Sequence, residues 1–200
     1  MQKTGELEKR NSFKNFDLSK LKRQKPPKDS SLETFREIKE LSKIKDNPKF
    51  VEDNDDMMKV FGNFATKNNY KFPEKIVKDM ALDAYDNVIK KLKFHFNRPR
   101  PKELAKEYGI KLNDIELKSM KTPSYPSGHS AQGALIANIL SDKYPKAKKA
   151  FMQTAKNISD SRNIAHAHYK SDSDMGRKLG EQMYNHIKNK KNEKSTNKNG

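Results

Sequence analysis

The 200-residue sequence contains no cysteine and has no long apolar run. Without cysteine the chain can form neither a disulfide framework nor a thiolate site, so a metal ion would need histidine and carboxylate ligands. The longest apolar-leaning stretch, ALIANIL at residues 134–140, is far too short to span a bilayer, and we expect no transmembrane segment. The first residues, MQKTGELEKRNS, lack the apolar core of a secretory signal. The sequence as written therefore predicts a cytoplasmic protein, or a periplasmic or exported one if this N-terminus is not native.

Basic residues are abundant and are concentrated at the two ends of the chain. The sequence has 43 Lys and Arg against 26 Asp and Glu, a formal net charge of +17. Residues 1–28 hold nine basic and three acidic residues, and residues 188–200 hold five and one. We interpret 1–28 as a basic extension that is partly ordered at most, 29–187 as one folded domain, and 188–200 as a Lys/Asn-rich disordered tail. We take these ends as solubilising and expect no dedicated nucleic-acid partner.

The pattern of apolar residues predicts an all-α protein. Apolar side chains recur at helical spacing, whereas the alternation typical of strands is nearly absent. Helices are expected over residues 30–45, 53–64, 73–95, 101–109, 130–141, 145–165 and 171–187. About seven helices of this kind form a compact bundle, in which apolar stripes face one another and loops gather reactive residues at one end.

Three segments concentrate reactive side chains that a core does not require. They are KLKFHFNRPRP at 91–101, PSGH at 126–129 and SRNIAHAHYKSD at 161–172. His166 and His168 with Asp172 and Asp174 are candidate metal ligands, but side chains two apart on a helix point to different sides, so we expect no metal. The acidic run DNDD at 53–56 lacks the glycine and distal glutamate of a calcium loop, and we interpret it as an acidic helix start.

Together and in this order, the three segments resemble the signature of the phosphatidic-acid-phosphatase type 2 (PAP2) superfamily, which vanadium haloperoxidases share. That signature reads K-x6-RP, then PSGH, then SR-x5-H-x3-D, and Ser161, Arg162, His168 and Asp172 fit its third part. The stretches PSYPSGHS and HYKSD are most similar to the soluble class A non-specific acid phosphatases. The resemblance covers residues 25–187 and implies a PAP2-type domain, with its active site between helices at one end of the bundle.

The first part of the signature fits this sequence in two frames. Lys91 with Arg98 satisfies the spacing, and so does Lys93 with Arg100. Relatives often carry a further arginine two residues before the final one, and only the second frame reproduces this, with Arg98. We therefore favour Lys93 and Arg100 as the motif residues.

One position departs from the family pattern. Class A relatives tend to have glycine two residues before the nucleophile, where this chain has His166. A left-handed backbone there would explain the glycine, and histidine enters that region less readily than glycine does. We expect the departure to affect local geometry and not the catalytic set.

The resemblance implies a phosphate-binding set for this chain. Arg100, Arg162 and Lys93 would supply positive charge to the three equatorial oxygens of a phosphoryl group in transfer. The hydroxyl of Ser127 and the backbone N–H of Gly128 would complete the cradle.

The resemblance also implies three catalytic residues. His168 would attack phosphorus and form a phosphohistidine, while Asp172 would hold the other nitrogen of its ring. His129 would protonate the leaving group and then activate the hydrolytic water. No cofactor is expected, and vanadate would act as an inhibitor or transition-state analogue.

The expectation is thus a metal-independent acid phosphatase whose partner is a small phosphomonoester, with homo-oligomer formation left open. A vanadate-dependent haloperoxidase is an alternative enzyme, although its known members are much larger. An alternative from a different class is a basic protein that binds nucleic acid or an anionic membrane and has a vestigial site. The residues do not identify the physiological substrate or the pH optimum.

Overall fold

The structure is a computed structural model that describes residues 11–113 and 115–196 of the chain. Within these residues every regular element is a helix, which confirms the predicted all-α class. The elements before the PSGH segment are a 3-10 turn (Leu21–Arg23), α2 (Leu32–Leu41), α3 (Pro48–Asp53), α4 (Met57–Lys67), α5 (Glu74–Ala84), α6 (Lys90–Phe96), α7 (Pro101–Glu107) and a 3-10 turn (Lys118–Lys121). They are followed by α8 (Gly128–Lys143), a 3-10 turn (Pro145–Ala147), α9 (Lys148–Ile164) and α10 (Lys170–Thr196).

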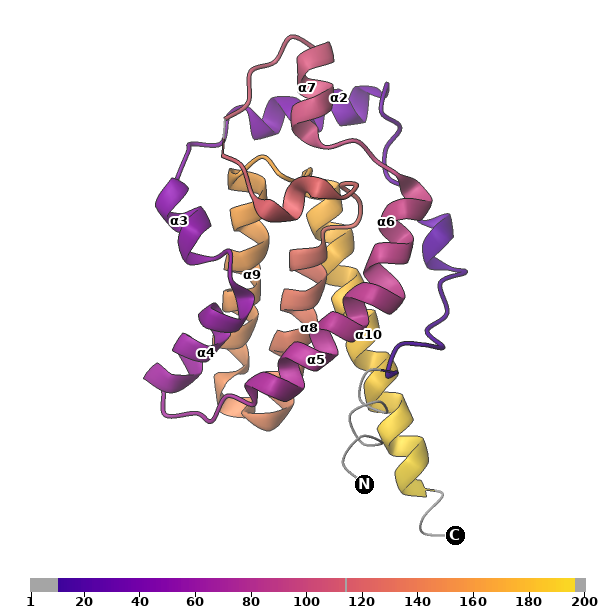
Figure 1. The fold of residues 1–200 in the computed structure, drawn as a ribbon, viewed down its shortest axis with the longest axis vertical. Helices are drawn as coiled ribbons and strands as arrows, with labels where there is room; N and C mark the ends of the chain where they lie inside the picture. The colour runs from indigo at the N-terminus through magenta and orange to yellow at the C-terminus, as the bar shows by residue number, and fades with distance from the viewer. Residues whose placement is uncertain (1–10, 114, 197–200) are drawn as a thin grey trace.

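Helix α8 is the centre of the fold and runs between α9 and α10 (Figure 1). Its sequence is rich in alanine, glycine and serine, and most of its residues are buried. Two glycines of α10 allow a very close approach. A Cβ atom on Gly176 would lie 2.5 Å from the carbonyl oxygen of Ser127, and one on Gly180 would lie 2.3 Å from that of Ala131. Because neither glycine has a side chain, α10 can pack directly against the backbone of α8.

A second layer is formed by one long helical segment that crosses α8. It runs from α5 through a π-helical turn at Tyr85–Ile89 into α6. The sequence predicted a single helix over 73–95, and the segment differs from that prediction by its π turn. Such turns are rare and frequently occur at functional sites. Here Tyr85, in the turn, and Lys93, in α6 directly after it, line the same pocket.

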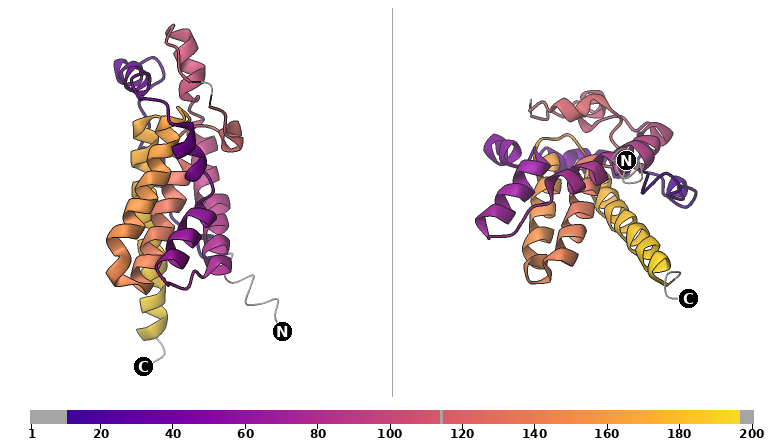
Figure 2. Two further views of the ribbon diagram at one scale, coloured as in Figure 1. Left: turned by 90° about the vertical axis from the view of Figure 1, so that its left-hand side faces the viewer. Right: turned by 60° about the horizontal axis from the view of Figure 1, so that its bottom comes forward.

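The elements α2 and α7 cover one end of the bundle (Figures 1 and 2). At this end α8 and α10 begin and α9 ends, so the PSGH segment and the SR-x5-H-x3-D segment meet there. Of the helices in the described ranges, none is both long enough and apolar enough to cross a bilayer.

Both ends of the folded part extend further than the sequence predicted. Phe13, within the predicted extension, is fully buried, and its backbone N–H lies 3.3 Å from an Asp83 carboxylate oxygen. Helix α10 does not end near Ile187 but continues to Thr196, into the segment predicted to be a disordered tail. That segment contains neither proline nor glycine before its last residue, so nothing in it terminates a helix. Residues 1–10 of the extension and 197–200 of the tail lie outside the described residues.

Candidate active site

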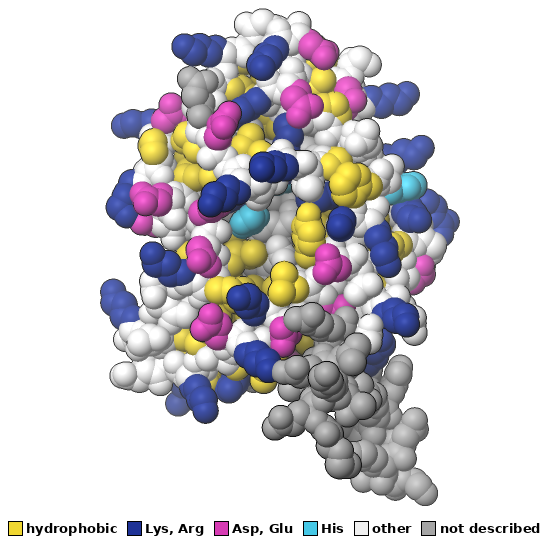
Figure 3. All heavy atoms as spheres, in the orientation of Figure 1, with side chains coloured by type: hydrophobic (Ala, Val, Ile, Leu, Met, Phe, Trp, Pro, Cys, Tyr) yellow, Lys and Arg dark blue, Asp and Glu magenta, His cyan; other side chains and the backbone are white. Residues whose placement is uncertain are grey.

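A pocket of about 230 Å³ lies at the covered end of the bundle. It is lined by Tyr85, Lys93, Arg100, Lys118, Ser119, Lys121, Thr122, Gly128, His129, Gln132 and His168. Five of the eight predicted site residues are in this set, namely Lys93, Arg100, Gly128, His129 and His168. Figure 3 shows a histidine side chain in a hollow near the middle of one face, bordered by basic side chains. Typical small-molecule pockets have volumes of about 300–1,000 Å³, so this pocket suits a compact polar group.

The imidazole of His168 is held in one tautomer. Its Nε2 lies 3.1 Å from Nη1 of Arg100, and its Nδ1 lies 3.2 Å from Oδ2 of Asp172. A guanidinium has only donors, so Nε2 must accept and the proton belongs on Nδ1, which donates to Asp172. Burial, followed by repulsion from Arg100, lowers the pKa of His168 well below its usual value. The ring is therefore neutral, with a lone pair on Nε2 at the pocket.

The carboxylate of Asp172 is fully buried in the first turn of α10. Its Oδ1 accepts from Arg98 at 2.7 Å, and its Oδ2 accepts from the backbone N–H of Tyr169 at 3.1 Å and from the Ser124 hydroxyl. Burial alone would raise its pKa, but the hydrogen bond with His168 and the charge of Arg98 outweigh burial and lower the pKa to about 2. Asp172 is therefore an anion at any pH above that value, and it fixes the tautomer of His168.

Arg98 is buried and does not line the pocket. Its Nη1 donates to Asp172, and its Nη2 donates to an Oε2 of Glu37 at 3.0 Å. The guanidinium also stacks on Tyr169, with 3.7 Å from its carbon to the ring centroid. Lys91, the other residue of the first frame, is exposed. Of the two frames, only the one with Lys93 and Arg100 has both of its cations at the pocket.

Lys93 and Arg100, which line the pocket, donate hydrogen bonds to the main chain of the loop before α8. Nζ of Lys93 donates to the carbonyl oxygen of Pro123 at 2.6 Å. The guanidinium of Arg100 donates to the carbonyl oxygens of Ser119 at 3.1 Å and Thr122 at 2.9 Å. Burial, and then the neighbouring Arg100, lowers the pKa of Lys93 to about 7, and burial lowers that of Arg100 to about 10. An anion in the pocket would restore both values, because it favours the charged forms.

Arg162 is buried beside the pocket and is paired with a residue that the sequence did not identify. Its Nη1 donates to Oδ1 of Asp55 at 2.7 Å, and Nε2 of His129 lies 4.0 Å from the same oxygen. Burial, and then the charge of Arg162, lowers the pKa of His129 to about 4, against the opposing effect of Asp55. Asp55 lies in DNDD, which we interpreted as a helix start. Asp56 of that run does cap α4, but nothing in the sequence points to the second role of its neighbour.

Ser127 and Gly128 form the start of α8. Ser127 is buried and outside the pocket lining; its hydroxyl accepts from the backbone N–H of Ser130 at 3.3 Å and so caps the helix. Gly128 does line the pocket. A Cβ atom there would have only ordinary contacts, the nearest at 3.7 Å from Ile89. Packing within the protein does not demand glycine at 128, whereas close approach of a ligand to a helix N-terminus would.

His166 has the left-handed backbone that we inferred from the glycine of relatives, with a φ of 52°. Its Nδ1 accepts from the backbone N–H of Asn113 at 3.0 Å. His166 is not among the residues that line the pocket, whereas His168 is. Within the described ranges, no three histidine or acidic side chains are grouped in a way that would hold a metal ion.

Residues 80–190, more than half of the chain, match the family model of the PAP2 superfamily. The chain therefore belongs to the PAP2 superfamily, as the order of the three motifs predicted. Among curated proteins it is similar to a non-specific acid phosphatase of Salmonella typhimurium (strain LT2), with 36% identity over 88 residues, 44% of this chain and 35% of that protein. It is also similar to a non-specific acid phosphatase of Providencia stuartii, with 30% identity over 119 residues, 58% of this chain and 47% of that protein. The matched regions thus span about a third to a half of these relatives.

Proposed function

We propose that the chain hydrolyses phosphate monoesters through a phosphohistidine and without a metal ion. The observation that carries the proposal is the position of the His168 ring between Arg100 and Asp172, from which its tautomer is assigned. The Nε2 lone pair of a neutral imidazole lies at a small pocket, where it accepts from Arg100 at 3.1 Å, while Asp172 holds the other ring nitrogen. In the proposed reaction Arg100 turns this donor to a phosphoryl oxygen, which frees the lone pair for phosphorus. The non-specific acid phosphatases among its relatives support the same reaction class.

In the proposed complex the phosphoryl oxygens are bound by Lys93, by Arg100 and by the backbone N–H groups at the start of α8. Catalysis of phosphoryl transfer consists mostly of positioning and charge stabilisation, so fixed cations can supply what a metal ion supplies elsewhere. Arg162 would join them by exchanging Asp55 for a phosphoryl oxygen. Its Nη2 is buried and has no hydrogen-bond partner in the described structure, so it retains donor capacity.

In the first step a bond forms between phosphorus and Nε2 of His168 as the bond from phosphorus to the leaving oxygen breaks. The leaving oxygen takes the proton of His129 and departs as an alcohol. The phosphorylated ring is cationic, and Asp172 stabilises it through the proton on Nδ1. In the second step His129 takes a proton from water, whose oxygen bonds to phosphorus as the bond to nitrogen breaks. Inorganic phosphate leaves and both histidines return to their starting states.

The proposed role of His129 predicts an acidic optimum. The residue must be protonated to act as an acid, and its pKa in the free protein is lowered to about 4. The value of kcat/KM, which reports the free enzyme, should therefore fall as pH rises through this range. A bound phosphate dianion raises the pKa of the same ring, so kcat should persist to higher pH than kcat/KM.

The test compares His168→Ala and His129→Ala with His95→Ala, a control in which the ring is exposed on α6. His168→Ala should lower kcat at least about a thousandfold. His129→Ala should cost about 10²–10⁴-fold with glycerol phosphate, and less with p-nitrophenyl phosphate, whose leaving group needs little protonation. Acid-labile phosphate should be trapped on wild type and not on His168→Ala. Wild-type turnover by pure His168→Ala would exclude this mechanism.

Vanadate and chelators extend the test. Vanadate is expected to inhibit as a five-coordinate analogue of the transferring phosphoryl group, whereas EDTA should leave activity unchanged. Peroxide-dependent halide oxidation by the vanadate-loaded protein, without phosphatase activity, would favour a haloperoxidase instead. Salt-dependent binding of nucleic acid by a protein with no turnover would favour the basic binding class.

A further inference from the structure

The pocket carries two lysines outside the PAP2 motifs. Lys118 and Lys121 are the first and last residues of a 3-10 turn, both are exposed, and both line the pocket beside Arg100 and His168. A 3-10 helix has three residues per turn, so side chains three apart lie on the same side. The two lysines therefore extend from the same side of the turn, and both residues line one small pocket.

The main chain of this turn is attached to the phosphate-binding cations. Arg100 donates to the carbonyl oxygens of Ser119, inside the turn, and of Thr122, directly after it. Lys93 donates to the carbonyl oxygen of Pro123, one residue further on. The two cations proposed to bind the scissile phosphate thus also fix the position of Lys118 and Lys121 relative to it.

The charge around the pocket exceeds what one phosphate requires. Lys93, Arg100, Lys118 and Lys121 are four cations around about 230 Å³, and none of the residues that line this pocket is acidic. A phosphate monoester carries at most two negative charges, which Lys93 and Arg100 already balance before the proposed contribution of Arg162 is counted. The two lysines of the turn are left to bind a second anionic group.

We propose that the preferred substrate carries a second phosphate, which Lys118 and Lys121 bind at the pocket mouth while the first phosphate reacts with His168. This assignment rests on the proposed phosphatase function and adds a substrate class to it, namely small diphosphates and bisphosphates. The lysines use charge alone and have long flexible side chains, so they accept a second phosphate attached to the first or separated from it by a short carbon skeleton. They contribute to substrate binding and take no part in the bond changes.

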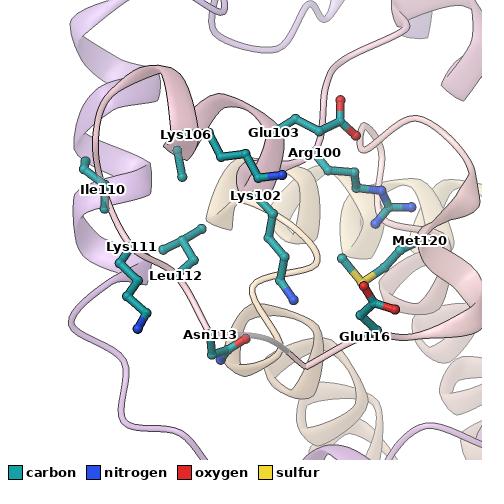
Figure 4. Close-up of a pocket in the computed structure, with 11 residues that line it drawn as sticks. Arg100, Lys102, Glu103, Lys106, Ile110, Lys111, Leu112, Asn113, Glu116 and Met120 are labelled. Atoms are coloured by element: carbon teal, nitrogen blue, oxygen red, sulfur yellow. The ribbon is translucent and has the colours of Figure 1, made fainter.

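The test removes both lysines and uses a control with the same loss of charge. Lys106 and Lys111 line a neighbouring cavity of about 450 Å³ beneath α7 (Figure 4), which shares Arg100 with the first pocket, and both lysines are exposed. The substitutions Lys118→Ala with Lys121→Ala are therefore compared with Lys106→Ala with Lys111→Ala. KM and kcat are measured for fructose 1,6-bisphosphate against fructose 6-phosphate, for inorganic pyrophosphate, and for p-nitrophenyl phosphate.

Wild type should favour the bisphosphate over the monophosphate, or pyrophosphate over p-nitrophenyl phosphate, about tenfold in KM. The double variant at 118 and 121 should lose this preference with kcat on p-nitrophenyl phosphate unchanged, and the control should keep it. A preference for only one substrate type would show whether the second phosphate is directly attached or separated, and either supports the proposal.

Three results would overturn the inference: no preference in wild type, a preference that survives in the 118/121 variant, or an equal loss in the control. Each leaves the proposed function intact if turnover of p-nitrophenyl phosphate still depends on His168. Absence of that dependence would instead refute the proposed function itself.

Discussion

Replacing Asp172 by asparagine should change the tautomer of His168 while leaving the shape of the site unchanged. Asparagine keeps the size of the side chain but presents an amide that is neutral and donates hydrogen bonds. Facing Nδ1 of His168, the amide NH₂ favours the tautomer that carries its proton on Nε2. That proton would then point at Nη1 of Arg100, 3.1 Å away, so two donors would meet and the nucleophilic lone pair would be lost.

The loss of activity follows from the wrong tautomer. In serine proteases, where a buried aspartate likewise holds the catalytic histidine, the same substitution lowers kcat by about 10⁴, and we expect about 10³–10⁴-fold here. KM should change little, since Lys93 and Arg100 keep their contacts with the loop before α8. A conformational loss of the phosphate site would instead raise KM.

The free energy of unfolding that Asp172→Asn loses can be estimated in two ways. Removing one partner of a buried ion pair costs about 3–5 kcal/mol, and the low end applies because Glu37 still compensates Arg98 at 3.0 Å. Independently, a pKa lowered from 3.8 to about 2 corresponds to about 2 kcal/mol of stability for the ionised carboxylate. The folded pKa lies below the unfolded one, so this stability is present above about pH 4 and is lost as pH falls toward 2.

The assay combines turnover of p-nitrophenyl phosphate with urea unfolding at pH 7 and pH 3. Asp174→Asn is the matched control, because Asp174 lies on the same helix and its ion pairs with Lys170 and Arg177 are partly exposed. The control should keep full activity and lose less than about 1 kcal/mol. If Asp172→Asn unfolded more easily yet kept kcat within tenfold of wild type, Asp172 would be a structural ion-pair partner only, and the tautomer argument would be refuted.

Three further substitutions test packing, phosphate access and pH dependence. Gly180→Ala would bring a Cβ atom to 2.3 Å from the Ala131 carbonyl oxygen, so it should destabilise the protein by roughly 1–3 kcal/mol or more, measured by thermal unfolding. Gly128→Ala meets no atom closer than 3.7 Å, so its melting temperature should equal that of wild type, while the inhibition constant of inorganic phosphate should rise about tenfold; an unchanged constant would exclude close approach to this backbone. Asp55→Asn removes the charge that raises the pKa of His129, so the fall of kcat/KM with pH should move to lower pH; an unmoved profile would exclude the coupling.

Much of the fold follows from local sequence patterns. Apolar residues at helical spacing predicted the helices, including the one over 130–141, which the structure places between α9 and α10 as α8. The π turn at Tyr85–Ile89 could not be predicted, since its extra residue per turn changes the apolar phase only slightly over a short segment. The burial of Phe13 depends on contacts with residues far along the chain, and composition suggested only a basic extension.

The site could be predicted as far as motif spacing reaches. Residues in the three motifs meet because the starts of α8 and α10 lie at the same end of the bundle. Asp55 could not be predicted in this way, because its effect on Arg162 and His129 depends on how the connection between α3 and α4 docks on α9. Asp55 lies 107 positions before Arg162, and no spacing rule connects residues so far apart.

The two frames of the first motif differ in how the protein compensates each buried cation. Arg98 is paired with Asp172 and Glu37, so its charge is already neutralised within the fold. The hydrogen-bond partners of Lys93 and Arg100 among the described residues are carbonyl oxygens and, for Arg100, the ring of His168. Carbonyl oxygens satisfy the N–H groups but cancel none of the charge, and burying uncancelled charge is costly. The lowered pKa values of both residues reflect that cost, which an incoming phosphate dianion would relieve. Identical spacing thus produces one arginine whose charge is neutralised within the fold and another whose charge is available to the proposed substrate.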